Sequence, residues 1–215
     1  MDRQTDYAPR ATQPLWERQS WLGAATLESV VEVNEQALAL FREQCRVAAE
    51  PSSLIRDVSS LMLNLDAKSL RCAAGSAVLL VDAQFADARS WSDALVGAVN
   101  DRPPCAPAAF FTVDGTVAVM RLVVTHAWHL ARSEPAAARL LLGLSAANLA
   151  VIGGCTLSRL THLAETRTQW LRPRWESRPR VWCNLLRTAG AGDTRAVERL
   201  RVQGLQLLAA DAPPG

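Results

Sequence analysis

The chain has 215 residues, with 23 basic and 21 acidic side chains and a formal net charge of +2. Hydrophobic residues make up 49% and charged residues 20%, which suits a folded domain and excludes disordered or collagen-like chains. No run approaches roughly eighteen uncharged apolar residues, and the N-terminus lacks an apolar secretion signal. We therefore expect a cytoplasmic protein that does not enter a membrane.

The N-terminal part of the chain predicts an irregular arm followed by a long helix. Residues 1–25 contain two prolines and scattered charges without a clear period. Apolar positions at helical spacing then predict a helix from Thr26 to about Glu50, where Pro51 ends it.

Three further helices are predicted before residue 90. One covers 52–64, and a short one begins after Asp66, a favourable N-cap, and closes at Gly75. The apolar residues that follow predict another helix through Ala83.

Residues 99–115 hold several prolines and an Asp-Gly pair, which predict a linker or a short hairpin. This linker separates an N-terminal helical module, 26–98, from a C-terminal module, 116–210. The predicted fold class is all-α, with two tandem small helical modules.

Helix signals recur throughout the C-terminal module, with prolines or capping residues at the helix starts and glycines at the ends. The predicted helices are Thr116–Arg132, Pro135–Leu142, one between the cap Ser145 and Gly153–Gly154, one capped by Thr156, and Thr194–Ala210.

The two modules show a weak internal repeat, which predicts a degenerate duplication. At a constant offset of 79 residues, 63–75 aligns with 142–154, and Trp91 aligns with Trp170.

Neither a metal site nor a catalytic site has a clear signature. The five cysteines are widely spaced, without a CxxC pair, and no phosphate-binding glycine loop occurs. His126 and His129 share a helix face without a carboxylate at ligand spacing. Cys155, His162 and Glu165 lack a recognisable oxyanion hole. The sequence thus predicts no enzyme activity and no cofactor.

The most unusual segment is 159–201, which contains ten arginines against four acidic residues. Its centre, WLRPRWESRPRVW, interleaves arginines with tryptophans, and its two prolines favour an extended or turned chain. Such a loop could contact phosphates, bind an acidic protein, or stack on its own domain. Composition alone leaves these three alternatives open.

Two short helices joined at a Gly-Gly turn, over 145–152 and 156–166, could form a helix-turn-helix. In the second helix we expect Leu157, Leu160 and Leu163 to face inward, with the polar side chains outward. The same pattern also fits an ordinary corner between two helices.

Residues 129–175 resemble the bacterial flagellar transcriptional regulator family FlhD. The resemblance is carried by Thr156–Leu157, by the contiguous Leu163–Ala164–Glu165–Thr166 and by Pro173–Arg174–Trp175 in place of a Phe-Arg-Phe element. It covers about 45 residues well and about 80 residues loosely, within the C-terminal module.

The resemblance implies an all-α DNA-binding subunit that works with a zinc-carrying FlhC-like partner in an oligomer and activates flagellar operons through RNA polymerase. Family members are about half as long as this chain. Leu171 stands where the family has an intersubunit cysteine, and the residues after the LAET motif also differ. A fused pair of copies would take the place of the family's homodimer.

Two functions follow as expectations. The first is an FlhD-like DNA-binding regulator of flagellar or related operons, and the alternative is a helical adaptor in flagellar or secretion-apparatus assembly. The candidate DNA-binding residues are Arg159, His162, Arg167, Arg172, Arg174, Arg178 and Arg180. One exposed arginine stripe would favour DNA, whereas arginines neutralised by Glu165 and Glu176 would favour the adaptor.

Overall fold

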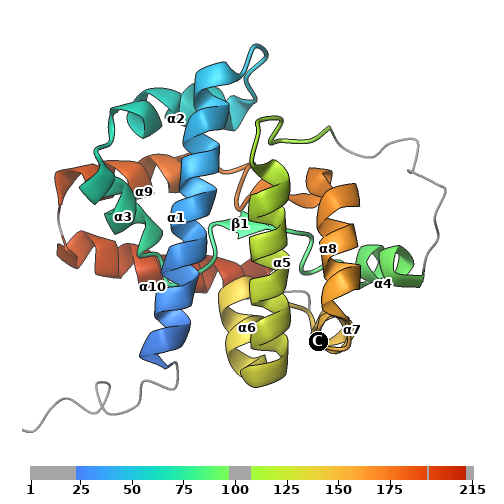
Figure 1. Ribbon diagram of the computed structural model, residues 1–215. Coiled ribbons are helices and arrows are strands. Elements are labelled where there is room, and N and C mark those ends of the chain that lie inside the picture. Colours follow the sequence, from blue (N-terminus) through green and yellow to red (C-terminus); the bar gives the residue numbers. More distant parts are fainter. Residues whose placement is uncertain (1–22, 97–107, 193, 212–215) are drawn as a thin grey trace, which may run out of the picture.

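A computed structural model describes residues 23–96, 108–192 and 194–211, and the fold is all-α with a single two-stranded ribbon in these ranges (Figure 1). The elements are α1 (Ala24–Val47), α2 (Ser53–Asn64), α3 (Ala67–Ala74), β1 (Val81–Asp82), α4 (Ala88–Val96), α5 (Thr116–Ser133), α6 (Pro135–Leu142), α7 (Ala146–Gly153), α8 (Leu157–Thr166), the 3-10 turn η1 (Thr168–Trp170), β2 (Arg172–Pro173), α9 (Pro179–Ala191) and α10 (Thr194–Asp211).

Most predicted helix boundaries are confirmed, because capping residues determine them locally. The side chains of Asp66, Ser145 and Thr156 each accept a hydrogen bond from a backbone N–H in the first turn of α3, α7 and α8. Pro135 begins α6, and α10 begins at Thr194 as predicted. Most of the predicted arm lies outside the described residues.

The helix predicted through Ala83 is wrong, since this segment is extended and forms β1. Buried Asn34 of α1 binds its backbone: Nδ2 donates to the carbonyls of Ala74 and Val78, and Oδ1 accepts from the N–H of Leu80. These bonds satisfy backbone groups that a helix would otherwise pair internally. Helix α4 has no counterpart among the predicted helices.

The predicted linker contributes to the core. Within 108–115, Phe110 and Phe111 are buried and pack edge-on against Phe41 of α1. One cluster of buried side chains includes residues of both predicted modules. Residues 97–107 lie outside the described part, and whether either module folds alone stays a prediction.

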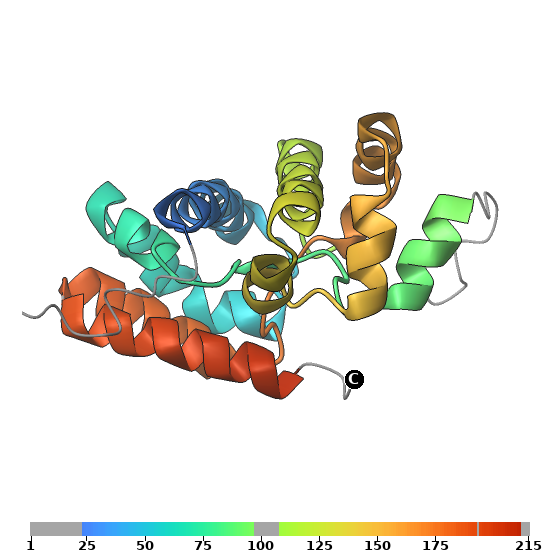
Figure 2. The ribbon, with the colours of Figure 1, turned by 90° about the horizontal axis from the view of Figure 1, so that it is seen from below.

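The elements repeat around the central pair α1 and α5, which run in opposite directions (Figures 1 and 2). In the first half, α1 packs on α2 and α3 and is followed by β1 and α4. In the second half, α5 packs on α7 and α8 and is followed by β2 and α9. The helix after each strand crosses to the opposite half: α9 packs on α2 and α3, and α4 packs on α7.

The contacts at the centre obey an approximate two-fold relation. β1 and β2 are antiparallel, with Val81 opposite Pro173 and Asp82 opposite Arg172. A few residues later, Gln84 and Trp175 adopt the same left-handed conformation, with φ of 56° and 55°. No other non-glycine residue in the described ranges has a positive φ, so this shared strained turn is specific.

Buried tryptophans complete the two-fold relation. Trp91 Nε1 donates to the carbonyl of Ala83 at 3.1 Å, and Trp182 Nε1 donates to the carbonyl of Arg174 at 2.7 Å. Both indoles are fully buried. Equivalent residues thus lie 91 positions apart in this region, and the caps Asp66 and Thr156 lie 90 apart.

The predicted register of the repeat is therefore wrong. The offset of 79 aligned α3 with α7 and Trp91 with Trp170, whereas α3 corresponds to α8 and Trp91 contacts Trp170 directly, with ring centroids 5.6 Å apart. The misalignment arose because both halves contain successive short helices of similar composition. Duplication as the origin of the two halves stays a prediction.

Candidate nucleic-acid or partner interface

The predicted arginine-rich interface begins on α8. This helix packs on α5 through buried Leu160, Leu163 and Ala164, which leaves Arg159 and His162 exposed on its outer side. The expectation that Leu157 faces inward is wrong, because it lies in the first turn of the helix and is 53% exposed.

Arg172 lies in β2, and its guanidinium is already bound on two edges. Nε and Nη2 donate to the two carboxylate oxygens of Glu176 at 2.7 and 2.8 Å, and Nη1 donates to the carbonyl of Ala108 at 2.7 Å. The side chain is 27% exposed. In this bidentate ion pair, Glu176 neutralises the charge of Arg172, as the adaptor alternative predicts.

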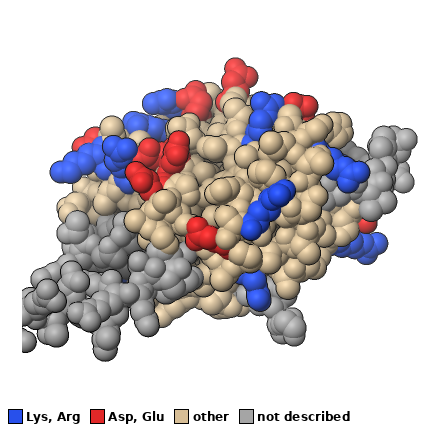
Figure 3. Space-filling model, turned by 60° about the horizontal axis from the view of Figure 1, so that its bottom comes forward, with Lys and Arg blue, Asp and Glu red and all other residues tan. Residues whose placement is uncertain are grey.

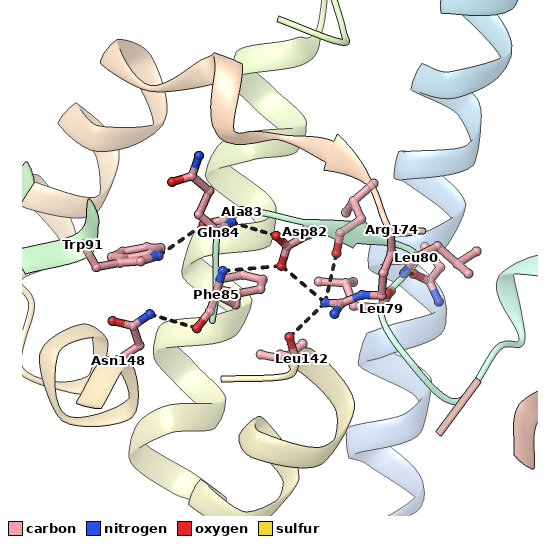
Figure 4. Close-up of polar contacts among 12 residues, drawn as sticks. Leu79, Leu80, Asp82, Ala83, Gln84, Phe85, Trp91, Leu142, Asn148 and Arg174 are labelled. Atoms are coloured by element: carbon pink, nitrogen blue, oxygen red, sulfur yellow. Dashed lines mark hydrogen bonds and ion pairs between the residues drawn. The ribbon is translucent and has the colours of Figure 1, made fainter. Parts of the chain in front are cut away.

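The prediction that Arg174 is available to a phosphate is wrong, because this residue is only 9% exposed. Its Nε donates to the carbonyl of Leu79 at 2.8 Å, and its Nη2 donates to the carbonyl of Leu142 at 2.8 Å (Figure 4). Nη2 also lies 3.7 Å from Asp82 Oδ1. Arg174 thus joins the segment before β1 to the end of α6, and its role is structural.

Arg178 and Arg180 flank the proline that begins α9, and both are exposed. The segment around Pro179 was expected to be extended or turned, but only the residues before Pro179 are. Helix α9 begins at Pro179, because proline is well tolerated in the first turn of a helix. Further back, Arg167 follows α8 and is half-buried, with its guanidinium carbon 6.0 Å from the ring centre of Trp170.

The candidate arginines therefore do not form one stripe. The α8 residues lie on the side of α5, whereas the start of α9 lies beside β2 and leads toward α2 and α3 (Figure 1). On the face shown in Figure 3, the described Lys, Arg, Asp and Glu side chains are scattered over a largely uncharged surface. Glu165, expected to neutralise these arginines, instead pairs with Arg121 of α5 at 2.9 Å.

A cleft of about 660 Å³ lies between β2 and the start of α9. Arg172, Glu176 and Arg178 line it together with Asp82 and Leu208. Arg174 also lines it, so arginines and acidic residues are mixed in its lining.

The sequence predicts no catalytic group among the histidines and cysteines. In the structure, burial shifts the pKa values of His126 and Cys155. His126 is buried, and burial, with a smaller effect of the nearby His129, lowers its pKa to about 4. Burial raises the pKa of the Cys155 thiol, an effect that Arg159 partly offsets. Among the described residues, no group of three or more His, Cys, Asp or Glu side chains could hold a metal ion.

Sequence reasoning missed the buried residues that organise the centre of the molecule. Asn34 and Asn148 both donate to backbone carbonyls of the segment around β1. Asn34 donates to Val78 at 3.0 Å, and Asn148 donates to Phe85 at 2.8 Å (Figure 4). Their positions on apolar helix faces were a usable signal, since an amide there needs a specific partner. Trp91 and Trp182 were also recognisable as equivalents, but only at the correct offset.

Comparison of the chain with family models, curated proteins and solved structures gave no match. The resemblance to FlhD thus rests on the motifs within 129–175 and stays a prediction. Within the described residues, no single helix is both long and apolar enough to cross a membrane; α6 and α7 satisfy that test only when taken together, and they are bent by 119°.

Proposed function

We propose that this protein is a non-enzymatic, FlhD-like transcriptional regulator whose single chain supplies both halves of a two-fold DNA-binding unit. The observation that supports the proposal is the repeated arrangement around β1 and β2. It relates the helix pair α2–α3 to the helix pair α7–α8, as a symmetry axis relates two reading units in a DNA-binding dimer.

In this proposal, the phosphate contacts come from cations that remain exposed. Arg180 at the start of α9 and Lys68 on α3 extend into solvent, as does Arg159 on α8. Arg174 stabilises the centre instead of contacting DNA. A partner subunit of the FlhC type and RNA polymerase would complete the regulatory complex, as the family resemblance implies.

A salt titration of DNA binding tests the proposal. The full chain, alone and with a co-expressed FlhC-type subunit, is titrated into labelled flagellar-promoter DNA and into shuffled DNA of equal length. We expect sequence-dependent binding that weakens with salt. Arg180→Ala should lower the logarithmic salt slope by about 0.9 for each phosphate that the Arg180 guanidinium neutralises.

Arg46→Ala is the matched control for this experiment. Arg46 is an exposed cation on α1 that pairs with Glu43 and belongs to no candidate set, so its removal should leave the slope unchanged. Equal binding to both DNAs, or no binding in the presence of the partner subunit, would contradict the proposal.

The adaptor alternative is favoured by a specific observation: Arg172 and Arg174 are satisfied by Glu176 and by backbone carbonyls of the same chain. These two central arginines of the basic segment therefore act within the fold. If the protein binds no DNA but forms a stable complex with another protein, the adaptor is the better explanation.

A further inference from the structure

Four helices form one layer on one side of the molecule. Figure 2 shows α3, α1, α5 and α8 in one row, with α9 and α10 on the opposite side. Within the row, α3 packs on α1, α1 on α5 and α5 on α8. No other described element lies over the outward sides of α1 and α5 (Figures 1 and 2). These sides, named here the front face, comprise Glu28, Glu32, Gln36 and Ala39 of α1 and Ala118, Arg121, Thr125, His129 and Arg132 of α5.

Hydrogen bonds near both ends of the front face set the register of α1 against α5. At one end, Thr26 Oγ1 donates to Glu134 Oε1 at 2.6 Å. At the other end, Gln44 Nε2 donates to Thr112 Oγ1 at 3.2 Å. The start of α1 therefore lies level with the end of the antiparallel α5.

The two helices carry opposite charge. α1 contains four glutamates and two arginines, whereas α5 contains two arginines and no acidic residue. Exposed Glu28 and Glu32, named here the acidic end, make no ion pair with any described residue. His129 and Arg132 of α5, named here the basic end, are exposed at the same level, and the Arg132 guanidinium carbon lies 4.9 Å from the ring centre of Trp128. Each end of opposite sign thus occupies its own helix.

The middle of the front face has small side chains. Ala39 and Ala118 are exposed, and Thr125 is half-buried. Beside them, Val117 is 37% exposed. The distance between packed helices depends on the side chains at the contact, so this middle part lets another helical layer approach closely.

The arrangement of charge on the front face matches a second copy of the same face. A two-fold axis parallel to α1 and α5, running between them along the front face, places α1 of each copy on α5 of the other. Because this axis is parallel to the helices, the acidic end of each copy meets the basic end of the other. A polyanion such as DNA would instead be repelled by the acidic end.

We propose that the front face binds a second copy of this chain in a symmetric dimer, with the acidic end of each copy on the basic end of the other. The dimer would bring together α1 and α5 of both copies, with the small side chains of the middle part at the centre. This inference goes beyond the proposed function and does not depend on DNA binding.

Two charge-reversal variants of the full chain test the proposal. The first carries Glu28→Arg and Glu32→Arg, and the second carries His129→Glu and Arg132→Glu. Molar mass is measured by sedimentation equilibrium over a series of protein concentrations, and circular dichroism checks that each variant is folded. Arg187→Glu is the matched control, because Arg187 is an exposed cation on α9 on the opposite side of the molecule.

The wild-type chain, of 23.3 kDa, should form a dimer with a dissociation constant between about 1 and 100 μM that weakens as salt is added. Each charge-reversal variant alone should dimerise about tenfold more weakly or worse, because like charges then meet at both contacts. An equimolar mixture of the two variants should recover the wild-type dimer, since every α1 then meets an α5 of opposite charge. All four substitutions in one chain should recover it as well, at nearly the wild-type net charge.

Other results overturn the proposal. A chain that stays monomeric up to about 1 mM does so, and so does growth beyond the dimer, which indicates a head-to-tail contact. A dimer that neither charge reversal weakens, or that Arg187→Glu weakens equally, uses another surface. A dimer that forms only after removal of residues 1–22 would identify the N-terminal segment as the occupant of the front face, and would overturn the proposal too. Promoter DNA is absent from all these measurements, so failure of the proposed function leaves them unaffected.

Discussion

Trp91 and Trp182 make the same hydrogen bond in the two halves of the molecule: each indole donates to the carbonyl of the residue eight positions earlier, at 3.1 and 2.7 Å. Each bond links the helix that follows a strand to the turn between that strand and the helix. The acceptor of Trp182 is the carbonyl of Arg174, whose side chain holds the centre together.

Replacing each tryptophan with phenylalanine should have similar effects in the two halves. Trp91→Phe and Trp182→Phe each leave a buried carbonyl without its donor and remove part of a fully buried ring. We expect each variant to lower the free energy of unfolding by about 1–3 kcal/mol, measured by urea denaturation. A large loss at one position with none at the other would contradict the equivalence of the two sites.

Arg174→Met should destabilise the protein by about 2–4 kcal/mol, because it leaves the carbonyls of Leu79 and Leu142 unpaired in the interior. Arg180→Met, at an exposed position of the same segment, should change stability by less than about 0.5 kcal/mol. Equal stabilities of the two variants, by urea denaturation, would show that the buried guanidinium contributes nothing.

Alanine substitutions at Gly143 and Gly192 distinguish the cost of backbone strain from the cost of steric crowding by an added Cβ atom. Both have a positive φ, 68° and 66°, at the ends of α6 and α9. A Cβ at Gly143 would lie 3.1 Å from Leu208 Cδ1 and 3.2 Å from an Arg174 nitrogen, whereas a Cβ at Gly192 meets nothing within 4 Å.

Gly192→Ala should therefore cost about 1 kcal/mol from strain alone, and Gly143→Ala should cost more by about another 1 kcal/mol. Thermal denaturation of both variants measures the difference. A smaller loss in Gly143→Ala than in Gly192→Ala would mean that α10 shifts freely away from α6.

The buried His126 makes stability depend on pH. Its folded-state pKa of about 4 lies below its usual value of 6.5, so the unfolded chain binds more protons between these values. Above pH 6.5 His126 is neutral in both states, and its titration does not reduce the free energy of unfolding. As the pH falls from 6.5 toward 4, protonation of the unfolded chain lowers the free energy of unfolding by about 3 kcal/mol.

His126→Leu removes this titration. Because His126 Nε2 is buried without a hydrogen-bond partner among the described residues, the variant should keep or exceed the wild-type stability at pH 7. Urea denaturation at several pH values should show that wild type loses more stability than the variant between pH 6.5 and 4. Parallel pH profiles would indicate that His126 has the same pKa in the folded and unfolded states.

Local sequence pattern was enough to predict the all-α class and most helix ends, because these depend on neighbours along the chain. Asp66, Ser145 and Thr156 cap the helices that follow them, whatever those helices pack against. Pro135 also marked a helix start correctly. The prediction from local pattern failed after Gly75, where a long-range partner, Asn34, binds the backbone in an extended form.

Which polar side chains reach solvent depends instead on long-range packing. Arg174 and Arg180 look alike in the basic segment, yet the first donates to the carbonyls of Leu79 and Leu142 in the interior and the second is exposed. The register of the two halves could not be predicted from local pattern either, since equivalence is defined by the packing of α1 on α5, of α9 on α2 and α3, and of α4 on α7. Burial and pairing arise from residues distant in the chain, and local composition carries no information about which distant residues meet.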